Sequence, residues 1–237
     1  MSDARSGATG AASEPAPDGP PGLAAWDFDG TITQRDTLMG FLSFVAGRRA
    51  LSAAAGRRVI ALGRGLRDDA SRDLAKERVI GDLMAGRALA DVEDAGRRYA
   101  ELLPAQFRPE ALERIRWHSE QGHSQVIVSA SLVYYLRPLA EDLGFVDVIG
   151  VELAVDDRGL CTGAFARPNV RGDQKALRLR EWLDGTLSVS DLDDGEDGGG
   201  LRRPRIWAYG NSSGDDALLA MADHPTWMGR RATRRTP

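Results

Sequence analysis

The stretch LAAWDFDGT, residues 23–31, decides the fold of this chain. Its first four residues, Leu23 to Trp26, are apolar, and Asp27 and Asp29 follow directly. A short apolar run that stops at polar, turn-forming residues is typical of a buried strand in a parallel sheet. We therefore expect a strand over 23–26 that carries two carboxylates at its carboxyl end.

Two later apolar runs stop in the same way. The run 126–128 ends at Ser129, and the run 206–209 ends at Gly210 and Asn211. Helical patterns fit the segments after these runs, over 132–143 and 215–222, and another helix fits 172–183. This alternation predicts an α/β fold with a Rossmann-like parallel sheet. In such sheets ligands bind at the carboxyl ends of the strands, where all three polar clusters fall.

Residues 36–109 have a different, helical character. No strand-like run interrupts them, and apolar residues such as Leu38, Phe41 and Leu42 recur at helical spacing. Further helices fit 51–66, 72–84 and 90–103. We therefore predict an α-helical cap over 36–109, inserted after the first strand of an α/β core that comprises 23–35 and 110–229. A hairpin with a glycine-containing turn is expected over 151–165.

Three other segments are too polar or too small-residue-rich to pack. Residues 1–22 are rich in Ala, Ser, Gly and Pro, which predicts a disordered tail and not a signal peptide. Acidic residues and glycines predict a flexible loop over 188–204, and arginines predict a frayed basic tail over 230–237.

The overall composition limits the class of function. A net charge of −4 and the lack of a long apolar stretch argue against nucleic-acid and membrane partners. Cys161 is the single cysteine, so no intramolecular disulfide can form, and a cytoplasmic location is expected. The sequence leaves the oligomeric state open. Only Lys76 and Lys175 are lysines among 31 basic residues, which indicates either chance or sites that need a compact ammonium group.

Asp27 and Asp29 suit phosphoryl transfer. One carboxylate can attack phosphorus and form an aspartyl phosphate. The other can protonate the leaving oxygen and later deprotonate a water molecule. Because an anion must approach an anionic phosphate, a Mg²⁺ ion, backbone N–H groups and a lysine would each reduce the repulsion.

The sequence DFDGT at 27–31 resembles the first motif of the haloacid dehalogenase superfamily. Ser129 resembles the second motif, Lys175 the third, and GNSSGDD at 210–216 the acidic fourth. The order of the motifs and the helical insert resemble the phosphoserine-phosphatase-like branch, subfamily IB, over roughly residues 23 to 227. The resemblance implies a Mg²⁺-dependent phosphatase with a Rossmann-like core.

The resemblance also implies roles for the residues of the first motif. Asp27 would be the nucleophile and a Mg²⁺ ligand. Asp29 would be the general acid and base, and its carbonyl oxygen would also reach the metal. Gly30 would let the backbone turn towards the phosphate, and Thr31 would steady that turn. The alternative for Asp29 and Gly30 is an ordinary strand-ending turn.

The second and third motifs would hold the phosphoryl group. Ser129 and the N–H groups after it, beginning with Ala130, would bind phosphoryl oxygens at a helix N-terminus. Lys175 would neutralise the phosphoryl group and the Asp27 carboxylate. The alternatives are a plain N-cap for Ser129 and a solvated helix start for Lys175, with Arg171 as the competing cation.

The fourth motif departs from the family pattern at Asn211, where an acidic Mg²⁺ ligand is usual. An amide oxygen can coordinate Mg²⁺, but the substitution removes one negative charge. Asp215 and Asp216 remain candidate ligands, directly or through water. The departure keeps open a catalytically weak protein that only binds a phosphate ligand.

The substrate is predicted to be a small phosphorylated metabolite, with phosphoserine as the first candidate. Asp36 stands where the phosphoserine phosphatases have a substrate-binding Glu, and Arg78 could supply their cap Arg; both could equally be surface charges. The chain's histidines lack metal-ligand spacing, so zinc chemistry is not expected. A phosphotransferase that uses an acceptor other than water is the second enzymatic alternative.

Overall fold

The computed structural model describes residues 22–62, 69–190 and 203–229. Nearly all of the predicted tail over 1–22 and the whole basic tail over 230–237 lie outside these residues. Most of the predicted loop over 188–204 lies outside them as well. Residues 188–190 form the end of helix α7 (Asp173–Ser190), so helix replaces the first part of that loop.

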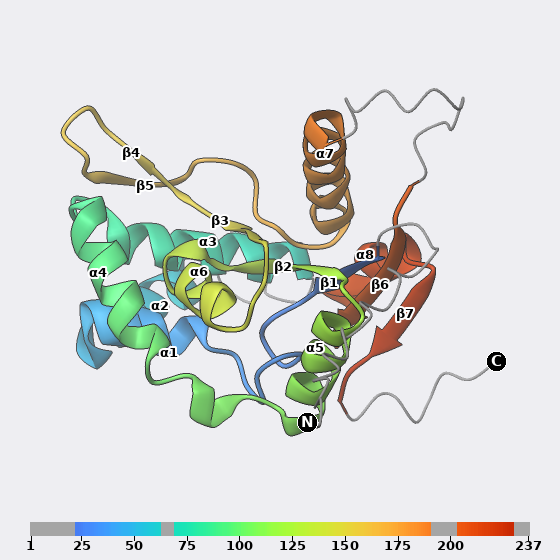
Figure 1. The fold of residues 1–237 in the computed structure, drawn as a ribbon. Coiled ribbons are helices and arrows are strands. Elements are labelled where there is room, and N and C mark those ends of the chain that lie inside the picture. Colours follow the sequence, from blue (N-terminus) through green and yellow to red (C-terminus); the bar gives the residue numbers. More distant parts are fainter. Residues whose placement is uncertain (1–21, 63–68, 191–202, 230–237) are drawn as a thin grey trace, which may run out of the picture.

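Parallel strands form the central sheet, in the order β3-β2-β1-β6-β7 (Figure 1). The central strand β1 pairs with β2 on one side and with β6 on the other, in parallel on both sides. This arrangement confirms the predicted α/β fold with a parallel sheet. The strands span Gly22–Trp26 (β1), Ser124–Leu132 (β2), Asp147–Val151 (β3), Arg205–Gly210 (β6) and His224–Trp227 (β7).

Strand β2 continues past its predicted end at Val128. Its pairing with β3 shifts register between Val128 and Leu132, so the polar residues between them lie on an irregular strand end. Ser129 and Ser131 are both buried there. Helix α6 (Val133–Asp142) starts only after this segment.

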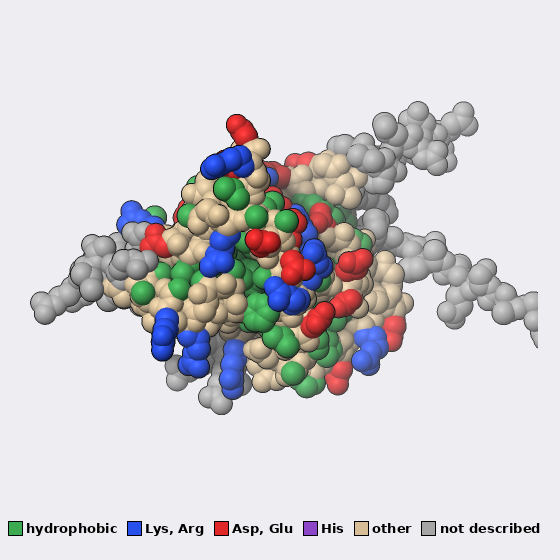
Figure 2. All heavy atoms as spheres, turned by 90° about the vertical axis from the view of Figure 1, so that its left-hand side faces the viewer, with side chains coloured by type: hydrophobic (Ala, Val, Ile, Leu, Met, Phe, Trp, Pro, Cys, Tyr) green, Lys and Arg blue, Asp and Glu red, His purple; other side chains and the backbone are tan. Residues whose placement is uncertain are grey.

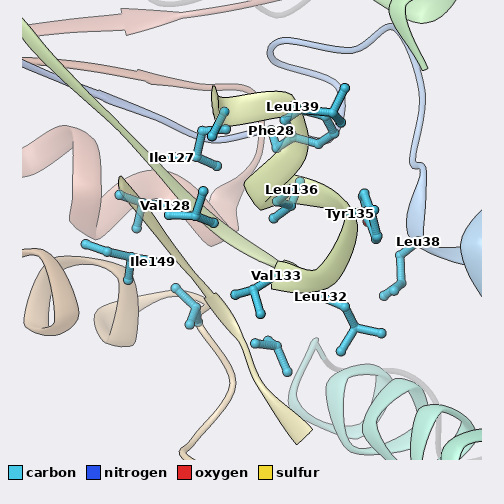
Figure 3. Packing of buried hydrophobic residues seen from close by; sticks show 14 of the residues in the cluster. Phe28, Leu38, Ile127, Val128, Leu132, Val133, Tyr135, Leu136, Leu139 and Ile149 are labelled. Atoms are coloured by element: carbon cyan, nitrogen blue, oxygen red, sulfur yellow. The ribbon is translucent and has the colours of Figure 1, made fainter. Parts of the chain in front are cut away.

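Helices cover both faces of the sheet. Helices α5 (Pro109–Glu120) and α6 lie on one face, and α7 lies on the other, packed beside α8 (Asp216–Ala220) (Figure 1). A 3-10 turn over Ser213–Asp215 precedes α8. Figure 3 shows apolar side chains of β2 and α6 packed together, with the cap residue Leu38 next to Tyr135. The apolar core thus continues from the sheet into the cap.

The cap consists of helices α1 (Leu38–Ala46), α2 (Arg48–Leu62), α3 (Asp69–Met84) and α4 (Leu89–Ala100). Helix α4 packs closely on the core helix α6, since a Cβ on Gly96 would lie only 2.3 Å from the Tyr134 carbonyl oxygen. The predicted hairpin is present as β4 (Leu153–Val155) and β5 (Cys161–Phe165), and it packs on α3. None of the described helices is long and apolar enough to cross a membrane.

The two segments that join cap and core run side by side. Thr33 bridges Phe107, and a 3-10 turn over Pro104–Gln106 leads into the second segment. The amide of Gln34 donates to the Gln106 carbonyl oxygen at 2.8 Å, and the amide of Arg108 donates to the Ile32 carbonyl oxygen at 2.8 Å. The base of the cap is therefore fixed directly beside the turn that follows Asp27.

Candidate active site

Asp27 lies at the carboxyl end of β1 with its carboxylate almost fully buried. Its amide donates to the Tyr209 carbonyl oxygen of β6 at 2.9 Å, which continues the sheet ladder up to this residue. Its Oδ1 accepts a hydrogen bond from Lys175 Nζ at 2.6 Å, and its Oδ2 accepts one from Thr31 Oγ1 at 2.8 Å. Thr31 thus steadies the Asp27 side chain itself as well as the turn.

Lys175, in the first turn of α7, is shared by two carboxylates. Its side chain is 2% exposed, and Nζ also binds Asp215 Oδ1 at 2.6 Å. Burial alone would lower the pKa of Lys175, but Asp27 and Asp215 outweigh it and raise that pKa. The ammonium group is therefore held charged, which excludes the solvated helix start that the sequence left open.

Asp215 organises the loop of the fourth motif. Its Oδ2 accepts hydrogen bonds from the amide of Asn211 at 3.0 Å, the amide of Ser212 at 2.9 Å and Ser212 Oγ at 2.9 Å. Burial would raise the pKa of Asp215, but Lys175 and these donors lower it. Burial raises the pKa of Asp27 to about 6, against the opposing effect of Lys175. Of the two carboxylates beside Lys175, the ionised form is therefore less stabilised at Asp27 than at Asp215.

Asp29 points towards the cap. Its Oδ1 accepts hydrogen bonds from the amide and from Oγ1 of Thr37, each at 2.6 Å, and its Oδ2 accepts one from Ser131 Oγ. Burial and the nearby Asp36 raise the pKa of Asp29, whereas these three donors lower it. The sequence motifs indicate neither Thr37 nor Ser131.

Gly30 is required by both its conformation and its surroundings. Its φ is +80°, and a Cβ would lie 2.0 Å from Asn211 Nδ2. Arg108 Nε donates to the Gly30 carbonyl oxygen at 3.1 Å, so the turn is anchored from the cap linker. In an ordinary strand-ending turn a glycine is needed only for its positive φ. At Gly30 the close approach of Asn211, from the fourth motif, requires a glycine as well.

Oxygen atoms from two motifs converge beside Asp27. Asn211 Nδ2 lies 3.3 Å from the Asp29 carbonyl oxygen, so the Asn211 amide group can present its own oxygen to the same place after a flip of the amide. Carboxylate, carbonyl and amide oxygens are the ligand types that Mg²⁺ prefers. Asp215 Oδ2 already accepts three hydrogen bonds from its own loop and Asp215 Oδ1 accepts one from Lys175, and Asp216 is exposed on α8. The described residues contain no group of three or more His, Cys, Asp or Glu side chains that could hold a metal.

Ser129 and Ala130 line the site from the end of β2. Ser129 is buried, and its Oγ accepts a hydrogen bond from the amide of Ser131 at 3.2 Å. Because α6 starts at Val133, these residues do not lie at a helix N-terminus as the sequence predicts. The irregular end of β2 presents them instead.

A cleft of about 530 Å³ brings the predicted residues together. Asp36 lies in its wall, but Arg78 is exposed on α3 outside it, and Lys76 of the same helix lines it instead. Both lysines of the chain therefore face this cleft. The only sequence signal for a role of Lys76 in the site was the rarity of lysine in this chain. The walls comprise Asp27, Asp29, Gly30, Gln34, Arg35, Asp36, Lys76, Ser129, Ala130, Arg171, Lys175, Asn211, Ser212, Gly214 and Asp215.

Figure 2 shows the molecule from the side of the cap. Side chains of both charge signs lie on this face, among groups of apolar side chains near its centre (Figure 2). The charges that line the cleft are mixed as well, with carboxylates from the turn after β1 and from the fourth motif and cations from α3 and α7. A ligand that carries charges of both signs suits such a surface.

Known proteins resemble this chain in sequence and in fold. A sequence model described as haloacid dehalogenase-like hydrolase matches residues 24–220. Protein CicA of Caulobacter vibrioides is 32% identical over 218 residues, which cover 92% of this chain and 89% of that protein. A protein with unknown function from Bordetella pertussis Tohama I has a TM-score of 0.66 at 20% identity, over 85% of this chain and 87% of that chain.

Phosphoserine phosphatases share the fold as well. A substrate-bound phosphoserine phosphatase complex has a TM-score of 0.53 at 16% identity, over 86% of this chain and 84% of that chain. At this identity the likeness concerns the fold. It extends over core and cap together, as the resemblance to subfamily IB implies. The chain therefore belongs to the haloacid dehalogenase-like hydrolase family.

Proposed function

We propose that this protein is a Mg²⁺-dependent phosphomonoesterase that forms a phosphoryl intermediate on Asp27. One observation carries the proposal: the buried Asp27 carboxylate lies in a cleft beside a shared ammonium group, with a second carboxylate two residues away. A purely structural ion pair would not need a 530 Å³ cleft or a glycine with positive φ at position 30.

The reaction has two steps. In the first, an Asp27 carboxylate oxygen attacks phosphorus, the bond from phosphorus to the leaving oxygen breaks, and that oxygen takes a proton from the Asp29 carboxyl group. In the second, the Asp29 carboxylate takes a proton from water, whose oxygen attacks phosphorus and releases phosphate and Asp27. Lys175 Nζ, at 2.6 Å from Asp27 Oδ1, reduces the repulsion between Asp27 and the phosphoryl group in both steps.

Mg²⁺ would be held by the Asp27 carboxylate, the Asp29 carbonyl oxygen and the Asn211 amide oxygen. When bound, it would supply positive charge to the phosphoryl oxygens. Asp215 would act indirectly, because it fixes Lys175 and the amides of Asn211 and Ser212.

Phosphoserine is the first candidate substrate. Its amino group would pair with the Asp36 carboxylate and its carboxylate with the Lys76 ammonium group, since both side chains line the cleft. Lys76 thus takes the role for which the sequence indicated Arg78. Asp36 lies at the start of the cap and Lys76 lies on α3, so a substrate of this charge pattern would bridge two separate cap segments.

The test is a screen of phosphorylated metabolites and 4-nitrophenyl phosphate with Mg²⁺ and with EDTA. The wild type should release phosphate only with Mg²⁺, and Asp27→Asn should lower the rate by at least about 10⁴-fold, as expected for loss of a nucleophile. Asp216→Asn is the matched control, because Asp216 is exposed outside the cleft. A wild type that turns over none of these compounds would refute the proposal.

Product analysis separates the second candidate. A phosphotransferase would release less phosphate than dephosphorylated substrate when an alcohol acceptor is present. The mixed charges of the cleft do not by themselves exclude an alcohol that accepts the phosphoryl group. Free phosphate and the new phosphoester should therefore both be measured.

A further inference from the structure

The Asp29 carboxylate is held by two residues, Thr37 and Ser131, that lie outside the four sequence motifs quoted above. Thr37 donates twice to Oδ1, through its amide and through Oγ1, each at 2.6 Å. Ser131 Oγ donates to Oδ2. A carboxylate has about four lone-pair sites, two on each oxygen. Oδ1 is therefore saturated, and one site remains open on Oδ2.

Thr37 is itself fixed from both lobes of the molecule. Because its hydroxyl hydrogen goes to Asp29, Tyr135 of α6 must donate its own hydroxyl hydrogen to Thr37 Oγ1, at 3.1 Å. Tyr99 of α4 donates to the Thr37 carbonyl oxygen at 2.9 Å. Both tyrosine side chains are buried. Thr37 also precedes α1, so the start of the cap and the orientation of Asp29 depend on the same residue.

We propose that Thr37 and Ser131 are positioning residues that make Oδ2 of Asp29 the oxygen that exchanges the proton with the substrate. The inference rests on the proposed function and refines it, because it assigns the proton transfer to one oxygen. It also makes that transfer depend on the seating of the cap, since Thr37 is held by one core tyrosine and one cap tyrosine.

The leaving group provides a selective readout. In the first step the proton on Asp29 Oδ2 passes to the leaving oxygen while the bond from that oxygen to phosphorus breaks. An alkyl alcohol needs this proton, because an alkoxide is a poor leaving group, whereas 4-nitrophenolate can leave without it. Mispositioning of Asp29 should therefore slow transfer from an alkyl phosphate and spare transfer from the aryl phosphate.

The experiment compares kcat/KM for phosphoserine and for 4-nitrophenyl phosphate in Thr37→Val, Thr37→Ser and Ser131→Ala. The parameter kcat/KM reports the steps up to the first phosphoryl transfer, so hydrolysis of the intermediate does not enter. Thr37→Val and Ser131→Ala should lower it for phosphoserine about 10- to 100-fold and for the aryl phosphate less than about threefold. Thr37→Ser keeps the hydroxyl and should restore most of the loss.

Tyr134→Phe is the matched control. Tyr134 is the buried neighbour of Tyr135 in the same helix, but its hydroxyl accepts from the Leu153 amide and does not reach Thr37. It should leave the ratio of the two kcat/KM values unchanged. Tyr135→Phe, which removes the donor to Thr37 Oγ1 and keeps Thr37, should shift that ratio in the same direction as Thr37→Val.

Equal losses for both substrates would overturn the inference, because they indicate a general structural defect. So would unchanged values in all the variants, or a wild type that hydrolyses the aryl phosphate alone. If Thr37→Val does not fold, Tyr135→Phe and Ser131→Ala carry the test. If the proposed function itself is wrong, Asp27→Asn will also leave the activity unchanged, and this result separates the two failures.

Discussion

His118 should make the protein sensitive to mild acid. Its side chain is fully buried on α5, and Arg114 Nε donates to Tyr209 Oη at 2.7 Å. Tyr209 Oη and His118 Nε2 lie 2.8 Å apart, and we assign the Tyr209 hydroxyl as the donor, which leaves Nε2 unprotonated. With this assignment His118 Nδ1 carries the hydrogen and donates to His123 Nδ1 at 2.8 Å. A proton on Nε2 would face another donor.

The magnitude follows from the pKa. Burial, then His123 and Arg114, lower the pKa of His118 to about 3, against an ordinary value of 6.5. A lowered histidine pKa stabilises the folded state above pH 6.5, and that stability is lost as the pH falls from 6.5 towards 3. Each pH unit in this window costs about 1.4 kcal/mol, so His118 alone should cost about 2 kcal/mol between pH 7 and pH 5.

Other groups titrate in the same window. The pKa of His123 is lowered as well, by burial and then by Arg114, and adds to the loss. The raised pKa of Asp27, about 6, acts in the opposite direction, because protonation at Asp27 favours the folded state. The effect of His118 is therefore obtained from a variant and not from the wild type alone.

The assay is urea unfolding at pH 7, 6 and 5, followed by the fluorescence of the tryptophans around His118. His118→Gln should lose about 2 kcal/mol less than the wild type between pH 7 and pH 5. His224→Gln, at an exposed position on β7, should follow the wild type. If His118→Gln and the wild type lose the same stability, the directed hydrogen-bond chain and the low pKa of His118 are both wrong.

Three further substitutions test the site. Lys76→Met should raise KM for phosphoserine about 10-fold. Arg78→Met, on the same helix but outside the cleft, should leave KM unchanged, and equal effects of the two substitutions would contradict the assignment of Lys76. Gly30→Ala should lower kcat about 100-fold, because its methyl group would displace Asn211, with a loss of folding stability of only about 1–2 kcal/mol. Near-normal turnover would show that the close approach of Asn211 to residue 30 is not needed. Asn211→Asp should lower the Mg²⁺ concentration for half-maximal activity about 10-fold, and an unchanged value would remove Asn211 from the metal site.

The sequence predicted the sheet well where strands are buried on both faces. Leu23, Val126 and Ile206 belong to the three central strands, whose continuous apolar runs admit few other structures. The edge strand β3 is buried over 148–151, but Gly150 interrupts its apolar run, and the edge strand β7 has no such run. His224 and Pro225 of β7 are exposed, and Pro is typical of edges but not predictive of a strand.

The predicted site residues share a simple property. Asp27, Ser129 and Asn211 come directly after apolar runs, so the topology of a parallel sheet alone brings them together. Thr37 and Lys76 do not follow from the sheet, whereas Ser131 lies on the irregular end of β2. Thr37 and Lys76 belong to the cap segment. Their roles depend on how the cap docks, for which the sequence carries no local pattern. An arginine at position 78 and a lysine at position 76 are equivalent as charges, and only the helix orientation decides between them.

The departure at Asn211 changes the charge balance as well as the ligand set. Asp27 and Asp215 share the ammonium group of Lys175, so these three groups carry a formal charge of minus one when ionised. An aspartate at position 211 would hold a Mg²⁺ ion more tightly but would add one negative charge facing an anionic substrate. We therefore expect Asn211 to weaken both the binding of Mg²⁺ and the repulsion of the phosphate, which is compatible with the proposed catalysis.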